Sequence, residues 1–251
     1  MTEAEWLEAA EPAPILEFLQ GKASDRKLRL FGVACARRIA HVIPEDLQPQ
    51  QIVDVNEAYA DGLSNGLNLN GALAAAVRSH RQHLLSYELD ESSSLTVIES
   101  IAISAICALG ETMEVAEVTQ NSAAAMGHIL FAEQNLSEEE ESQPVNPQGA
   151  TVKMLWIKKG WKNEYTEQSR LLRDIFPNPF RPVAIDPDWR ASSVISVARN
   201  MYDSRDFSPM PLLADALQDA GCENEDILNH CRGDGTHVRG CWVVDLILNK
   251  S

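Results

Sequence analysis

The sequence predicts an all-α fold, an array of packed helices that can divide into two helical subdomains. Three observations predict it. Apolar residues recur three and four positions apart through most of the 251 residues. Ser, Thr or Asn precedes several of these stretches, and Gly follows some of them, as expected of helix caps. One stretch, 95–109, is apolar nearly all round, which is typical of a buried central helix.

The first elements carry recognisable start signals. Thr2 and Glu5 form a capping box before a short helix that contains Trp6. A second short segment spans 15–19. Ser24 then caps a longer helix, which we expect to reach about residue 43. Four further helices are predicted at about 49–62, 71–88, 95–109 and 112–134. The last of these carries small residues on its apolar stripe, which would allow a neighbouring helix to approach closely.

Residues 137–149, SEEEESQPVNPQG, are acidic and contain proline without apolar periodicity, which is typical of a linker. We therefore predict an acidic helical domain over 1–135, a linker over 136–150 and a C-terminal helical domain over 151–251. The two domains can also pack as one unit.

The C-terminal part is predicted to hold shorter helices. Residues 151–176 fit a strand in places, but the spacing favours a helix. Prolines in the following segment, NPFRPVAIDPDW, are expected to keep it from forming a helix. Further helices are expected from Asp186 or Ser192 to about 202, over 209–220 and over 224–232. A final helix is expected to start at Thr236.

Composition excludes several functional classes. The formal charge of −16 lies almost entirely in residues 1–150, with 8 basic and 23 acidic residues against 13 and 14 in the remainder. We therefore predict neither nucleic-acid binding nor attraction to anionic lipid. No stretch has the roughly 20 apolar residues that cross a bilayer, and the acidic N-terminus does not resemble a signal peptide. We expect a cytoplasmic protein, and its five cysteines do not indicate a disulfide framework.

Both ends of the chain resemble a set of uncharacterised bacterial proteins. The front segment, EAEWLEAAEPAPILEFLQGKASDRKLRLF, and the back segments, LLRDIFPNPFRP and LADALQDAGCENEDILNHCRGDGTHVRGCWVVD, carry the resemblance over about half of the sequence. The resemblance implies a recurring helical architecture around a variable middle. It implies no activity and no functional residues.

The densest cluster of chemically active side chains lies near the C-terminus. Cys222, Cys231, His237 and Cys241 are candidate ligands for a structural Zn²⁺, because His and Cys four residues apart on a helix face the same point. The eight-residue spacer between the first two cysteines is longer than in common zinc motifs. The alternative is that the cysteines are buried core residues, and Cys231 lies on an apolar stripe.

The same segment suits an enzyme in a second interpretation. His237, Cys241 and Asp245 lie at successive turns of the expected final helix, and thiol, imidazole and carboxylate are the parts of a cysteine nucleophile system. His230 is a further candidate for this centre. Groups stacked along one helix need not converge, however.

Asp245 interrupts the apolar run WVVDLIL, so it is expected to be buried and to need a cationic partner. Arg181, Arg232 and Arg239 are the candidates for that partner. We expect an ion pair that ties the final helix to the NPFRP segment.

The favoured functional hypothesis is a non-enzymatic helical protein whose C-terminal half binds another protein, because Arg and Trp are enriched at interfaces. The candidate binding residues are Arg181, Trp189, Arg232 and Arg239. The rival hypothesis is a metal site or enzyme at the Cys/His cluster. The sequence carries no nucleotide-binding glycine motif and no metalloprotease or serine-hydrolase motif.

Overall fold

A computed structural model describes residues 1–86, 94–110, 113–146 and 148–250. These residues form thirteen α-helices and three short 3₁₀ segments, and no strand occurs among them, which confirms the predicted all-α class. The predicted helix ends at 87–88 and at 112 lie outside the described residues. The α-helices are α1 (Glu3–Glu8), α2 (Pro12–Leu19), α3 (Asp25–Ile39), α4 (Pro49–Ala60), α5 (Gly66–Ser86), α6 (Ser94–Cys107), α7 (Val115–Ala132), α8 (Glu138–Ser142), α9 (Val152–Ile175), α10 (Ser192–Ser204), α11 (Met210–Asp219), α12 (Glu225–Arg232) and α13 (Trp242–Leu248).

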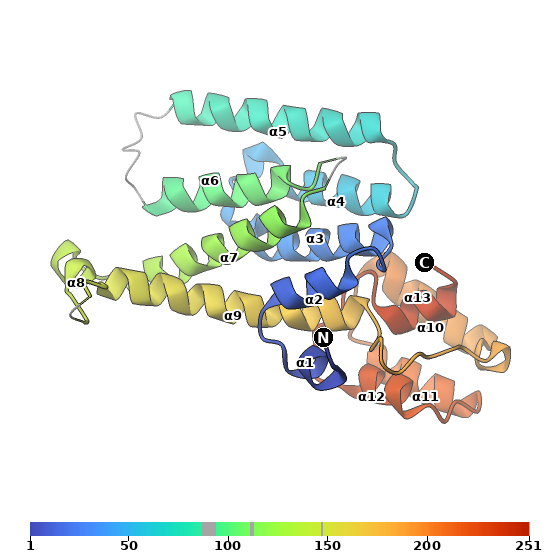
Figure 1. Cartoon of the computed structure of the whole chain (residues 1–251). Coiled ribbons are helices and arrows are strands. Elements are labelled where there is room, and N and C mark those ends of the chain that lie inside the picture. The colour runs from blue at the N-terminus through green and yellow to red at the C-terminus, as the bar shows by residue number, and fades with distance from the viewer. Residues whose placement is uncertain (87–93, 111–112, 147, 251) are drawn as a thin grey trace.

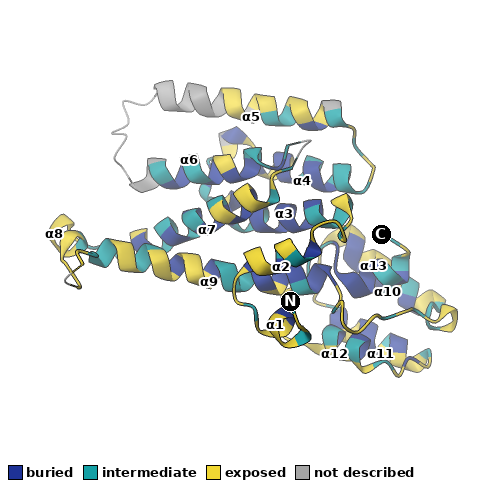
Figure 2. Ribbon diagram, in the orientation of Figure 1, coloured by how far each residue is buried: buried dark blue, intermediate teal, exposed yellow. Residues whose placement is uncertain are grey.

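The longest described helix, α9, lies beneath α7 in Figure 1 and extends from the tip at α8 to the C-terminal helices. Helices α3 to α7 lie stacked on one side of it, α1 and α2 cover its C-terminal half, and α10 to α13 gather at its C-terminal end. The short helix α8 lies at the opposite tip, where most residues are exposed (Figure 2). No described helix is both long and apolar enough to cross a membrane.

Buried apolar residues form two clusters. The first draws on α1 to α4, α6, α7 and the end of α9, and includes Trp6, Phe31 and Leu172. The second is formed by α10 to α13 and includes Met201 and Trp242. The first cluster ends at Phe176 and the second starts at Val194. The boundary between the two cores therefore lies after α9 and does not coincide with the predicted linker at 136–150.

The close approach predicted for the small-residue helix occurs between α7 and α9. A Cβ atom placed on Gly160 would lie 2.6 Å from the Cα of Gly127, and one placed on Gly127 would lie 2.7 Å from the carbonyl oxygen of Ile157. Only glycine fits at both positions, and the indole of Trp161 lies against Gly127. This contact explains why α9 packs with the N-terminal bundle although the predicted linker separates them in sequence.

Two predicted elements differ from the structure. The segment 137–149 is not wholly irregular, because Ser137 and Glu140 form a capping box that starts α8. The final helix begins at Trp242 and not at Thr236. Gly240 has a φ of +100°, and a Cβ there would meet Leu30 at 3.0 Å. This left-handed turn ends any helical path before Cys241, so residues 233–240 form a loop.

Candidate metal centre

Four side chains from three helices and one loop converge at the junction of the two cores. Asp174 lies in the last turn of α9, His230 in α12, His237 in the loop before α13, and Cys241 caps α13. One potential ligand atom of each lies within 4.8 Å of all the others. The side chains of Asp174 and His237 are 5% and 7% exposed, and Cys241 is fully buried. This cluster is called the Asp174 centre below.

The separations within the Asp174 centre are short. Oδ1 of Asp174 lies 2.6 Å from Nδ1 of His237 and 3.2 Å from Nε2 of His230. Sγ of Cys241 lies 3.2 Å from the same His230 nitrogen and 3.9 Å from Nδ1 of His237. Tetrahedral zinc, with bonds of about 2.0–2.3 Å, sets its ligand atoms about 3.3–3.6 Å apart. The observed distances fall on both sides of that range.

The hydrogen bonds fix one tautomer of His230. The indole Nε1–H of Trp242 donates to His230 Nδ1 over 3.1 Å. Because an indole nitrogen is only a donor, Nδ1 of His230 must accept. A neutral His230 then carries its proton on Nε2, where it can donate to Asp174. His237 donates from Nδ1 to the same carboxylate, and its buried Nε2 has no hydrogen-bond partner among the described residues.

Asp174 is an ionised carboxylate in a buried place. Burial opposes its ionisation, but hydrogen bonds from His230 and His237 outweigh burial and hold the pKa of Asp174 below its usual value. Its second oxygen, Oδ2, accepts the backbone N–H of Val238 over 2.9 Å. The backbone of the loop therefore orients the carboxylate while the two imidazoles surround it.

The surroundings of the Cys241 thiol change its pKa in the opposite direction. Burial raises its pKa well above the usual value, and the charge of Asp174 raises it further. An activated cysteine needs a lowered pKa and access to substrate. The structure does not bring the predicted nucleophile residues His237, Cys241 and Asp245 into one group, because the Cys241 thiol is buried and the Asp245 carboxylate is bound by Arg26.

The structure brings together only two of the four residues in the predicted zinc quartet. His237 and Cys241 do converge, but Cys222 and Cys231 are not part of any described metal-ligand group. Both are buried in the second apolar cluster, and burial raises the pKa of Cys231 to about 12. They are core residues, as the alternative interpretation held. Asp174 and His230 take their places.

Asp245 is buried and ion-paired as predicted, but its partners differ from the three candidates. Arg26 of α3 binds both carboxylate oxygens, at 2.7 and 3.1 Å, and the Lys27 ammonium lies 3.4 Å away. Arg26 also donates to Asp61 and Tyr202. The pair ties α13 to the N-terminal bundle and not to the NPFRP segment.

The predicted protein-binding residues are engaged within the chain. Arg181 pairs with Glu3 and Asp226, and Arg232 pairs with Asp215. Arg239 pairs with Glu57 and Asp61, and its side chain is only 13% exposed. Trp189 packs partly buried against the second apolar cluster.

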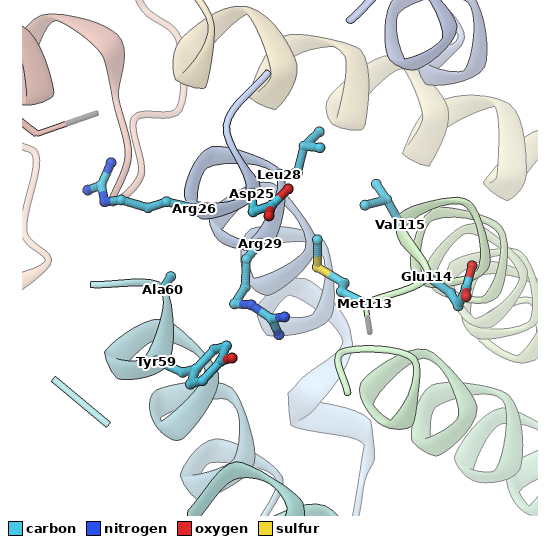
Figure 3. Close-up of a pocket in the computed structure, with 9 residues that line it drawn as sticks. All are labelled: Asp25, Arg26, Leu28, Arg29, Tyr59, Ala60, Met113, Glu114 and Val115. Atoms are coloured by element: carbon cyan, nitrogen blue, oxygen red, sulfur yellow. The ribbon is translucent and has the colours of Figure 1, made fainter. Parts of the chain in front are cut away.

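A cavity of about 560 Å³ lies between α3, α4 and the start of α7 (Figure 3). Arg29 lies over the Tyr59 ring at 4.7 Å, and its guanidinium donates to Asn56 and to the carbonyl oxygens of Leu109 and Gly110. Arg26 points away from both, toward the C-terminal part (Figure 3). The guanidinium of Arg29 thus joins α3 to α4 and to the residues after α6.

Asp174 is the member of the centre that sequence reasoning missed. Together with Arg173 it interrupts an apolar run formed by Leu171, Leu172, Ile175 and Phe176. An acid within an apolar run is the signal that marked Asp245 as buried, but the adjacent Arg173 makes that signal weaker at Asp174.

No family model matches the chain, and no similar protein is found among the curated proteins or the solved structures. The resemblance of both ends to uncharacterised bacterial proteins stays a prediction.

Proposed function

We propose that Asp174, His230, His237 and Cys241 bind one divalent transition-metal ion, for which Zn²⁺ is the best match. The observation that carries the proposal is the convergence of a carboxylate, two imidazoles and a thiol within 4.8 Å in a buried place. Mixed oxygen, nitrogen and sulfur ligands in a four-coordinate arrangement suit zinc.

Charge balance supports the proposal. An ionised Asp174 and a Cys241 thiolate together neutralise a dication, whereas the free thiolate is opposed by burial and by Asp174. Two neutral imidazoles complete the shell without adding charge. The 2.6 Å hydrogen bond between Asp174 and His237 would lengthen as the metal replaces its proton.

The proposed role of the ion is structural. All four positions of a tetrahedral shell are filled by protein atoms, whereas catalytic zinc keeps one position for water or substrate. The ligands join the end of α9 to α12, α13 and the loop between them. An ion at this place would fasten the C-terminal helices to the bundle.

Metal analysis of protein purified without chelator tests the proposal. We expect about one zinc per chain, a melting temperature that falls on chelation, and loss of the metal in His237→Ala and Cys241→Ser. Cys231→Ala is the matched control, because that cysteine is equally buried but lies outside the centre. Protein without bound zinc that also fails to take up added zinc would refute the proposal.

A second candidate function, protein binding, is favoured by the exposed face of α9. Met154, Leu155 and Trp161 are 58%, 49% and 40% exposed, beside Lys158, Lys159 and Lys162. Large apolar side chains gathered with lysines are typical of an interaction surface. The rest of the chain is acidic, so a second copy complements these lysines.

Sedimentation at low ionic strength tests this second candidate. We expect self-association that Leu155→Glu abolishes and that Leu212→Glu, a matched change at a 62% exposed leucine of α11, leaves intact. A monomer at all concentrations would exclude a second copy as the partner.

A further inference from the structure

A second cavity, of about 280 Å³, lies between the two cores on the other side of α3. Residues of α3 and α9 form one wall, and residues of the segments after α10 and before α13 form the other. Four arginines line it, Arg37, Arg38, Arg205 and Arg239, together with a single carboxylate, Glu57. It is called the arginine cavity below.

From this arrangement we infer that the arginine cavity binds a small organic anion, one with a carboxylate or phosphate head and a compact apolar body. The inference goes beyond the metal site and does not depend on it.

The cavity lining is rich in guanidinium groups. Glu57, which is almost fully buried, contacts three guanidinium groups, those of Arg37, Arg205 and Arg239. The four arginines that line the cavity pair with four carboxylates, Asp54, Glu57, Asp61 and Glu164. Of these carboxylates only Glu57 lines the cavity, so the lining itself presents four guanidinium groups and one carboxylate to a ligand.

Several N–H groups of these arginines have no hydrogen-bond partner among the described residues. Arg37 is bonded through Nη2, and Arg38 through Nε and Nη2. The Nε of Arg239 is buried and has no hydrogen-bond partner in the described part of the chain, although buried donors are nearly always paired. Guanidinium groups bind carboxylate and phosphate through paired N–H donors.

The cavity wall is also partly apolar. Leu30, Val33, Ala34, Leu171, Phe207 and Val238 give the cavity an apolar part. A bare inorganic ion would leave this surface uncovered, whereas a ring or short alkyl chain would cover it. The cavity is small for a ligand site, since such sites usually measure about 300–1,000 Å³. The ligand is therefore expected to be small.

Isothermal titration of the full chain at low ionic strength tests the inference. The probes are phenyl phosphate, benzoate and inorganic phosphate. Phenyl phosphate and benzoate compare the two head groups, and phenyl phosphate and inorganic phosphate show how much the apolar ring adds to the affinity. We expect one site for phenyl phosphate or benzoate, and binding at least tenfold weaker for inorganic phosphate. The stronger of the two aromatic probes identifies the preferred head group.

Arg37→Gln and Arg205→Gln should each weaken the aromatic probe about tenfold or more, because each removes a charge-assisted hydrogen bond. Either variant leaves Glu57 two of its three arginines, and circular dichroism checks that it folds. Arg170→Gln is the matched control, since Arg170 is exposed on α9 and pairs with Glu167 outside the cavity.

Three results would overturn the inference. The first is that no aromatic probe binds at millimolar concentration. The second is that inorganic phosphate binds as tightly as phenyl phosphate, which would indicate an adventitious ion only. The third is equal weakening by Arg170→Gln, which would indicate a general effect of charge. Repeating the titration after chelation separates this inference from the metal site, because the arginines remain when the metal is gone.

Discussion

The indole nitrogen of Trp242 donates to Nδ1 of His230 over 3.1 Å, and the two ring centroids lie 5.0 Å apart. This hydrogen bond stabilises the tautomer in which His230 carries its proton on Nε2. A metal bound at Nε2 needs the opposite tautomer, with the proton on Nδ1, where it would face the indole N–H. Metal binding and the Trp242 hydrogen bond therefore compete for the same histidine.

From this competition we expect Trp242→Phe to bind Zn²⁺ more tightly than the wild type. The gain should be about fivefold, the value of one neutral hydrogen bond of about 1 kcal/mol. Titration against a coloured chelator measures it, with Trp189→Phe as the matched control. Weaker binding in Trp242→Phe would mean that the indole supports the metal-bound form, and the competition argument would fail.

The crossing of α7 and α9 gives a prediction about stability. Gly160→Ala should lower the free energy of unfolding by about 1–3 kcal/mol, because its methyl group would lie 2.6 Å from the backbone of Gly127. Gly71→Ala is the control: it is also helical, nothing lies within 4 Å of its Cβ, and it should gain up to about 1 kcal/mol. Urea unfolding compares the two. If both substitutions change the free energy of unfolding by the same small amount, α7 and α9 can move apart at no cost in free energy.

The helices were predictable because caps and apolar spacing act locally. Thr2 with Glu5, Ser24 and Asn224 all cap where the sequence indicated. The start of α13 was not predictable in this way, because the left-handed turn at Gly240 depends on its packing against Leu30, which is distant in sequence. Local spacing could not show that Cys241 is the N-cap residue before α13 and not a residue in the middle of a helix.

The candidate site was predictable only in part, for a similar reason. His237 and Cys241 are close in sequence, so the sequence could predict that their side chains converge. Asp174 arrives from α9, 63 residues before His237, and only the fold brings it there. The partner of Asp245 shows the same limit, since Arg26 lies 219 residues away. A buried acid could be recognised from its apolar neighbours, but its partner could not.

Asp61 should make stability depend on acid pH. Its side chain is 1% exposed, and although burial opposes ionisation, the Tyr202 hydroxyl and the charges of Arg239 and Arg26 lower its pKa below the usual value. A carboxylate with a lowered folded pKa stabilises the fold above its unfolded pKa of about 3.9, and the contribution is lost as the pH falls through the folded value. Stability conferred by Asp61 is thus complete at neutral pH and disappears in acid.

Urea unfolding at several pH values tests this in Asp61→Asn. The variant should be about 3–5 kcal/mol less stable than the wild type at pH 7, because Arg26 and Arg239 lose a buried partner. The difference should shrink as the pH falls from about 5 toward 3. Tyr202→Phe, which removes one donor to Asp61 at 2.6 Å, should show a smaller change of the same sign. A difference that stays constant with pH would contradict the role assigned to Asp61.

A double-mutant cycle on Arg26 and Asp245 tests how the last helix is held. Asp245→Leu leaves Arg26 and Lys27 buried without that carboxylate, so it should cost about 3–5 kcal/mol. Arg26→Met leaves Asp245 with Lys27 alone and should cost a similar amount. The double variant removes the unmatched charge that each single variant leaves at the Arg26–Asp245 pair, while Lys27 still lacks Asp245 and Asp61 still lacks Arg26. Its loss should therefore be smaller than the sum of the two single losses by at least about 1 kcal/mol. Additive losses would mean that the pair is not coupled, and α13 would then be held by its apolar contacts and not by the ion pair.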